Sequence, residues 1–193
     1  VDPVIQFDND PAENLRKSRL FCKRHHARLF EMTSDRFFAS RKILLYWHGL
    51  DVAFIDGLHT YRQSLLDAEN ALRHLRTGGF AVLHDCLPAT EAEACAAGSL
   101  EEAAAMDVPG WNNAWCGEVW RTIVHMRALR DDLSVCVIDC DHGVGIVKRG
   151  SPESPLSLTP DQVSALTFSD LALRRSELLN LKPPAELDAF LRR

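Results

Sequence analysis

Two short apolar runs flank a helical pattern in the middle of the chain. Residues 52–55 and 80–83 are continuous apolar runs, which are typical of strands covered on both faces of a parallel sheet. The segment between them repeats apolar residues at the spacing of one helix face, at Leu65, Ala68, Leu72 and Leu75. Gly78 and Gly79 are expected to end this helix. The pattern therefore predicts a strand, a helix and a second, parallel strand, joined by a right-handed crossover.

The residues upstream of this unit predict further elements of an α/β fold. Residues 11–26 have the composition of a surface helix with a basic C-terminal end, which favours the helix dipole. Residues 28–32 are expected to form a short strand, and Ser34 is expected to cap a short helix that follows it. We expect Val1 to be the last residue of an earlier strand.

The residues downstream predict two helices and a closing hairpin. Leu100–Ala105 and residues 117–129 have helical patterns. Leu133–Ile138 and residues 144–147 resemble strands, and the short link between them fits only an antiparallel hairpin. We therefore expect a mixed α/β sheet that is mostly parallel and ends in this hairpin.

The end of the chain differs in composition from the part before it. Residues 151–155 hold two prolines and two serines, which is typical of a linker. The residues after it alternate polar and leucine-rich stretches, which predict short helices packed on the domain or on a partner. We therefore expect a sheet domain over residues 1–150, and a linker with a helical tail over residues 151–193.

Composition restricts the class of protein. Of the 193 residues, 46% are hydrophobic and 25% are charged, as in soluble globular domains, and the net charge of −5 gives no positive field that would attract nucleic acid. No apolar stretch reaches the roughly 18 residues that a membrane helix needs. The six cysteines include no C-x-x-C pair, so we expect reduced thiols and a cytoplasmic protein. Cys136 and Cys140 should share one strand face with Ile138, in the core.

Polar residues follow each predicted strand of the parallel part of the sheet. Ligands of open α/β sheets bind beyond the carboxyl ends of the strands, so these residues are the candidates for chemistry. They are Asp2, the pair Ser34 and Asp35, the segment from Asp56 to His59, and the pair His84 and Asp85. Repeated carboxylates at such an edge favour a cationic or hydroxyl-rich ligand, or a metal ion.

The central segment resembles a known enzyme family. Residues 51–61 read DVAFIDGLHTY and residues 77–85 read TGGFAVLHD. They resemble the I-D-G-x-H-x-Y and G-G-x-x-x-x-x-D signatures of small class I S-adenosylmethionine-dependent methyltransferases, and the predicted hairpin resembles the antiparallel seventh strand of that fold. The resemblance implies a Rossmann-like three-layer sandwich. It also implies an enzyme that methylates a small-molecule acceptor, most simply a hydroxyl of a small molecule or sugar.

The resemblance also assigns residues to the cofactor. Asp2 would accept hydrogen bonds from the ribose hydroxyls of S-adenosylmethionine. Ser34 and Asp35 would border the adenine, and Asp56 would lie near the methionine part and the acceptor. The glycine-rich motif of the family has no counterpart in these residues, so they resemble a methyltransferase domain without its first strand and helix. A non-catalytic Rossmann-like scaffold or partner-binding module is the alternative.

Two mechanisms fit the candidate catalytic residues His59, Asp56 and Asp85. His59 is the best general base for a hydroxyl acceptor, because an imidazole titrates near neutral pH. Alternatively, Asp56, His84 and Asp85 would hold Mg²⁺ or another divalent metal, as the acids of catechol-type methyltransferases do. Cys86 stands where those enzymes have Asn or Asp.

The segment from Trp111 to Trp120 is the candidate acceptor pocket. It holds three tryptophans within ten residues, which would supply flat apolar walls, and Asn113 and Glu118 would be the polar anchors. The alternative is that Trp115 and Trp120 pack in the core and Trp111 lies in a loop. The helical tail could be a lid or the surface of a homodimer, and no nucleic acid or membrane partner is expected.

Overall fold

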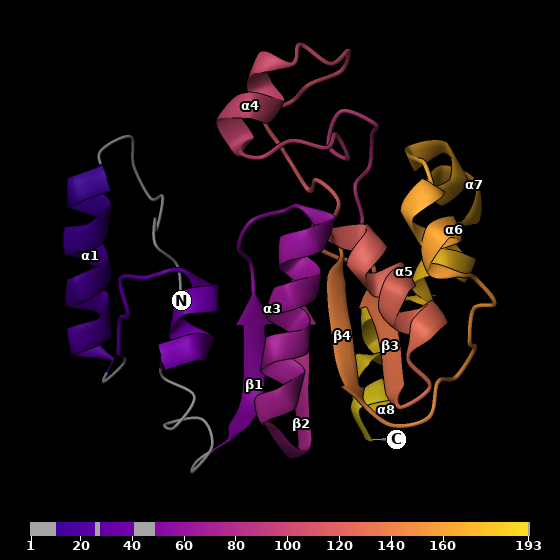
Figure 1. Ribbon diagram of the computed structural model, residues 1–193, viewed down its shortest axis with the longest axis horizontal. Coiled ribbons are helices and arrows are strands. Elements are labelled where there is room, and N and C mark those ends of the chain that lie inside the picture. The colour runs from indigo at the N-terminus through magenta and orange to yellow at the C-terminus, as the bar shows by residue number, and fades with distance from the viewer. Residues whose placement is uncertain (1–10, 26–27, 41–48, 193) are drawn as a thin grey trace. The chain divides into compact units, whose positions relative to one another are not determined.

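The computed structural model describes residues 11–25, 28–40 and 49–192, which belong to two compact units (Figure 1). The first unit ends at Gly49 and contains α1 (Pro11–Arg24) and a short helix over residues 34–40. The second unit begins at Leu50 and contains the sheet. Its elements are β1 (Leu50–Ile55), α3 (Tyr61–His74), β2 (Leu75–Leu83), α4 (Leu100–Ala105), α5 (Val119–Leu129), β3 (Leu133–Ile138), β4 (Val144–Arg149), α6 (Pro160–Ala165), α7 (Phe168–Leu179), β5 (Leu181–Lys182), a 3-10 turn (Pro184–Glu186) and α8 (Leu187–Arg192).

The first unit confirms the predicted surface helix and corrects its surroundings. Residues 28–32 form no strand; the chain there is irregular, and the short helix follows it directly. Thr33 caps that helix in place of the predicted Ser34, because the Thr33 hydroxyl accepts a hydrogen bond from the backbone N–H of Arg36 at 3.3 Å. Val1 and Asp2 lie outside the described residues.

The second unit contains the predicted crossover. β1 and β2 pair in parallel, and α3 connects them after an N-cap at Thr60, whose side chain accepts from the N–H of Gln63. Gly78 and Gly79 do not end the helix as predicted but lie inside β2. A Cβ at Gly79 would lie only 2.8 Å from the carbonyl oxygen of Leu50, so this glycine allows the start of β2 to approach β1 closely.

The closing hairpin is inserted into the sheet and does not lie at its end. The five strands of the described sheet are ordered β1-β2-β4-β3-β5, and four of them run in one direction. β4 runs against both of its neighbours, β2 and β3. This confirms the mostly parallel sheet and the antiparallel hairpin that were predicted, and the resulting fold is a Rossmann-like α/β fold.

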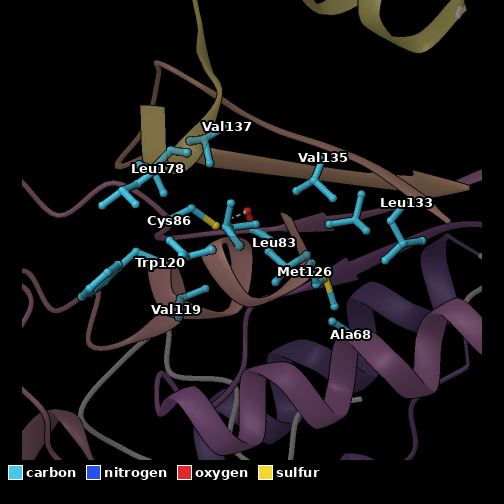
Figure 2. Packing of buried hydrophobic residues seen from close by; sticks show 14 of the residues in the cluster. Ala68, Leu83, Cys86, Val119, Trp120, Met126, Leu133, Val135, Val137 and Leu178 are labelled. Carbon is cyan, nitrogen blue, oxygen red and sulfur yellow. Dashed lines mark hydrogen bonds between the residues drawn. The ribbon is translucent and has the colours of Figure 1, made fainter. Parts of the chain in front are cut away.

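Helices pack on both faces of the sheet, but the expectation that residues 52–55 are covered on both faces was wrong, because Val52 and Phe54 of β1 are exposed. Helices α3 and α5 cover one face, and α8 covers the other, which gives three layers (Figure 1). Leu133, Val135 and Val137 of β3 point toward the α5 side, where Figure 2 shows them with Val119, Trp120 and Met126. The opposite face carries Cys136, Ile138 and Ile146, which pack against Phe190 of α8.

The cysteines are all free thiols. Cys136 is buried beside Ile138, as predicted, but Cys140 is exposed because β3 ends at Ile138 and the chain turns away from the core. Within the described part of the chain, none of the helices combines the length and the apolar character needed to cross a bilayer.

Arg127 fastens the tail to the sheet domain. This buried residue of α5 donates to the backbone oxygens of Glu177 and Ser154, and it also donates to the Ser154 hydroxyl at 2.8 Å. Burial lowers its pKa to about 10, so the guanidinium stays charged at neutral pH. Residues 151–192 thereby belong to the second unit. The domain boundary predicted near residue 150 stays a prediction.

We expect Arg127→Leu to loosen the tail, because the carbonyl groups of Glu177 and Ser154 would lose a charged donor. Hydrogen bonds to charged groups contribute about 1.5–3 kcal/mol each, so the loss of stability should be of at least this size. Urea unfolding and hydrogen exchange of the amides of α7 would measure it. Arg174→Leu is the matched control, since Arg174 forms only an exposed ion pair with Glu177, at 2.7 Å. Equal effects of the two changes would contradict the role given to Arg127.

A polar contact between Tyr61 and His125 joins α3 to α5. The hydroxyl of Tyr61 lies 2.6 Å from Nδ1 of His125. Burial is the main influence on His125 and lowers the pKa of its imidazole below 6.5, with Arg130 acting in the same direction and Glu69 against it. The folded protein therefore favours neutral His125, whose unprotonated Nδ1 can accept from the tyrosine.

This contact predicts a pH dependence of stability. As the pH falls through about 6.5, the unfolded chain takes up a proton at His125 more readily than the folded chain does. The free energy of unfolding therefore decreases as the pH falls below this value. Urea unfolding at pH 7.5 and at pH 5.5 should therefore show a smaller acid-side loss in His125→Gln than in the unaltered protein. A larger loss in the variant would reverse the sign and contradict the assignment.

Candidate active site

The candidate site lies at the carboxyl edge of β1 and β2. Asp56 follows β1 directly, and His84 and Asp85 follow β2. Because the two strands are parallel neighbours, their ends meet at the same edge of the sheet. The N–H of His84 donates to the carbonyl oxygen of Ile55 at 3.0 Å, which holds the two ends together. The predicted residues of these strands therefore share one site.

His59 is at the centre of this site, just before α3 begins. Its Nδ1 lies 2.7 Å from the carbonyl oxygen of Trp115. A carbonyl can only accept, so Nδ1 carries the proton and donates. The other ring nitrogen, Nε2, lies 3.4 Å from Asp56 Oδ1 and 3.4 Å from Asp85 Oδ2. The three predicted catalytic residues are thus brought together around one imidazole nitrogen.

The charges of this group stabilise one another. Burial opposes the charged form of His59, but the contacts with Asp56, with the Trp115 carbonyl and with Asp85 outweigh burial and raise the pKa of the imidazole. The bond from His59 is in turn the main influence on Asp56, and it lowers the pKa of that carboxyl group. The site therefore favours an imidazolium between two carboxylates, and a neutral His59 there is a stronger base than free imidazole.

His84 adds a second imidazole to the site. Its Nδ1 lies 3.2 Å from Asp85 Oδ2, and its Nε2 lies 3.2 Å from Oδ2 of Asp141, at the tip of the β3–β4 hairpin. Burial disfavours the charged ring, but Asp85, Asp141 and Asp56 outweigh it and raise the pKa of His84. Asp85 thus lies between two histidines.

Asp85 has an unusual backbone conformation. Its φ of 58° is in the left-handed region, which aspartate tolerates better than most residues because of its short polar side chain. Such conformations concentrate at functional sites, where the surrounding structure holds them in place. Here the N–H of Cys86 donates to Gly143 and that of Leu87 donates to His142, so the hairpin tip fixes the chain directly after Asp85.

Comparison with known families finds a match that includes this site. Residues 2–86 match a family model described as a methyltransferase domain, and the match includes Asp56, His59 and Asp85. This part of the chain is similar to methyltransferase domains. No curated protein matches the chain. The matched residues of the methyltransferase domain end just after Asp85, so the carboxyl edge of β1 and β2 lies within them.

The predicted cofactor residues are distributed over both units. Asp2 lies outside the described residues. Ser34 and Asp35 lie in the first turn of the short helix of the first unit, and Asp56 lies in the second unit. The cofactor assignments of these four residues remain predictions.

The predicted acceptor segment divides into three environments. Trp120 is buried in the core, as the alternative interpretation expected. Asn113 is exposed in a left-handed turn, and Trp111 is half-buried. Glu118 supports the domain itself: its carboxylate accepts from the N–H of Tyr61 and lies 3.4 Å from Arg121. The roles of Trp111, Asn113 and Glu118 in substrate binding remain predictions.

The site also has the donors that a divalent metal needs. Asp56, His59 and Asp85 each offer a ligand atom, and these atoms lie within 4.8 Å of one another. The predicted set contained His84 in place of His59, and both rings contact the same carboxylate. Metal-bound histidines usually donate their other ring N–H to a carbonyl, as His59 does to Trp115. Two carboxylates with an imidazole suit Mn²⁺ or Zn²⁺ better than Mg²⁺.

The contacts of several residues with the site were not predicted from the sequence. The Trp115 ring stacks against His59 with a centroid distance of 5.1 Å and donates its indole N–H to the Cys95 carbonyl. Asp141 and His142 resemble an ordinary hairpin tip in the sequence, but they reach the site because β4 is inserted beside β2. Cys116 contacts Asp85 at 3.5 Å. The sequence signals were the density of tryptophans near Trp115 and the ligand-like composition of residues 139–142, which is also typical of a hairpin tip.

Gly117 determines how closely α5 approaches the site. Its φ is 55°, and a Cβ at this position would overlap the carbonyl oxygen of His59. The next residue, Glu118, donates its N–H to that same oxygen at 2.8 Å. Glycine is therefore required both by the left-handed backbone and by the contact with His59.

We expect Gly117→Ala to destabilise the domain and to displace His59. Gly110→Ala is the matched control, because Gly110 also has a positive φ, of 87°, but has no atom within 4 Å of the added carbon. The control should lose about 1 kcal/mol from backbone strain alone, and Gly117→Ala should lose clearly more. Urea unfolding would measure both, and the His59 ring signal in NMR spectra should shift only in Gly117→Ala. Equal losses would contradict the packing role.

Proposed function

We propose that the protein is an S-adenosylmethionine-dependent methyltransferase that acts on a hydroxyl group of a small molecule or sugar. The observation that carries the proposal is the position of His59 Nε2, 3.4 Å from both Asp56 and Asp85, at the carboxyl edge of a methyltransferase domain. Open α/β sheets bind their ligands at this edge. S-adenosylmethionine supplies an electrophilic methyl group on its sulfonium sulfur.

Methyl transfer to a hydroxyl needs a group that removes the hydroxyl proton. In the base mechanism, neutral His59 accepts that proton at Nε2, and Asp56 and Asp85 stabilise the imidazolium that forms. The bond from Nδ1 to Trp115 keeps the ring oriented so that Nε2 faces the acceptor side. The indole of Trp115, stacked against the ring, supplies a flat apolar wall for the acceptor.

A divalent metal is the second way to activate the hydroxyl. Asp56, Asp85 and one of the two imidazoles, His59 or His84, would hold it, and a bound cation would lower the pKa of a coordinated hydroxyl. His59 cannot serve as ligand and base at Nε2 at once. Metal dependence therefore changes the role of His59 and leaves the position of the acceptor the same.

The first test is binding of the cofactor product. Calorimetric titration of the full-length protein with S-adenosylhomocysteine should show saturable binding, and Asp56→Asn should weaken it because the carboxylate borders the ligand. Asp139→Asn is the control, because Asp139 is an exposed acid outside the site, and this variant should bind S-adenosylhomocysteine as the unaltered protein does. Absence of binding at millimolar ligand would reject the enzyme and favour the non-catalytic Rossmann-like module.

The second test separates base from metal. Methyl transfer from labelled S-adenosylmethionine to a panel of phenols, catechols and sugars should fall by about 10²- to 10⁴-fold in His59→Gln if His59 is the base, and a chelator should then have no effect. If a metal activates the hydroxyl, Asp85→Asn and the chelator should reduce kcat more than His59→Gln. Asparagine tolerates the left-handed backbone of Asp85, so the fold is retained. Full activity of both variants would contradict the proposed site.

A further inference from the structure

A second group of metal ligands lies beside the first, on the other side of Asp85. Asp85, Cys116 and His142 each offer one ligand atom, and these atoms lie within 4.8 Å of one another. They come from three separate segments: the end of β2, the approach to α5, and the tip of the β3–β4 hairpin. The Cys116 thiol donates to Asp85 Oδ1 at 3.5 Å, so sulfur and carboxylate are already in contact.

The chemistry of this group differs from that of the site around His59. One thiol, one imidazole and one carboxylate form a donor set that suits Zn²⁺ and similar borderline metals, whereas sulfur is a poor ligand for Mg²⁺ or Ca²⁺. Sequence spacing gives no sign of this set, because 31 residues separate Asp85 from Cys116.

Backbone hydrogen bonds hold all three ligand positions in place. The N–H groups of Cys116 and Gly117 both donate to the carbonyl oxygen of Glu93, at 2.9 Å. The N–H of Leu87 donates to the carbonyl oxygen of His142 at 2.7 Å, which joins the hairpin tip to the chain after Asp85. The ligands are therefore positioned by the fold before any ion binds.

Glu93 supplies an outer partner for the histidine. Its side chain is only 3% exposed, and its carboxylate accepts from the N–H of Ala89 at 2.8 Å and from Asn112 at 2.9 Å. One carboxylate oxygen lies 3.9 Å from Nδ1 of His142. A carboxylate beside a ligating histidine orients its ring and strengthens metal binding.

The geometry points to a Zn²⁺ site formed by Asp85, Cys116 and His142. The ion would bind the Cys116 sulfur as a thiolate, and the thiol proton would leave to solvent, so one proton is released for each ion bound. Three protein ligands leave a fourth position for water, and the half-exposed His142 opens the site to solvent. Bound there, the ion would crosslink β2, the approach to α5 and the hairpin tip.

Co²⁺ is a suitable probe, because it replaces Zn²⁺ and its bond to a thiolate absorbs in the near ultraviolet. The full chain, freed of metal with a chelator and kept reduced, should show this absorption on titration with Co²⁺, and Zn²⁺ should abolish it by displacement. Cys116→Ser should remove the band. His142→Ala should weaken Co²⁺ binding by more than the tenfold to about 100-fold that loss of an outer partner causes.

Two controls make the test specific. Cys140→Ser removes an exposed thiol two residues before His142 and should leave the band unchanged. Asp56→Asn changes a ligand that belongs only to the group around His59 and should also leave the band unchanged, so the band distinguishes the two groups although they share Asp85. Loss of the band in Cys140→Ser with retention in Cys116→Ser would overturn the proposal, as would Co²⁺ binding without any thiolate absorption. The readout does not depend on methyl transfer.

Discussion

The hydrogen bond between His59 Nδ1 and the carbonyl oxygen of Trp115 is the contact on which the site depends. It joins the start of α3 to the segment that leads into α5, two regions 56 residues apart. It fixes the proton on Nδ1 and directs Nε2 toward Asp56 and Asp85. Without it the ring could rotate away, and neither a base nor a metal ligand would be held at the carboxyl edge of the sheet.

The crossover and the hairpin could be predicted from the sequence because their signals are local. Continuous apolar runs and the helical repeat between them depend on residues that are neighbours along the chain. The strand expected over residues 28–32 was wrong. The run is short and only partly apolar, and the sequence pattern around it predicts no neighbouring strand with which it could pair. The prediction that Gly78 and Gly79 end a helix was also wrong, because glycine is common both at helix ends and where two strands approach closely.

The candidate site could be predicted only in part, for the same physical reason. Asp56, His59 and Asp85 follow strands, so the rule for open sheets identifies them. Asp141 and His142 become part of the site only through the insertion of β4 between β2 and β3. That insertion is a long-range property of the fold, and no spacing in the sequence reports it.

The place of β4 in the sheet has a consequence for the order of assembly. Figure 1 shows β4 between β2 and β3, although it is made after both. During synthesis, β1, α3 and β2 can form first, with one edge of β2 open to any other strand. Because β4 leads out of the hairpin tip, its pairing with β2 both covers that edge and places Asp141 and His142 beside the candidate site. Protection of the strand edge and placement of these two side chains thus depend on the same strand pairing.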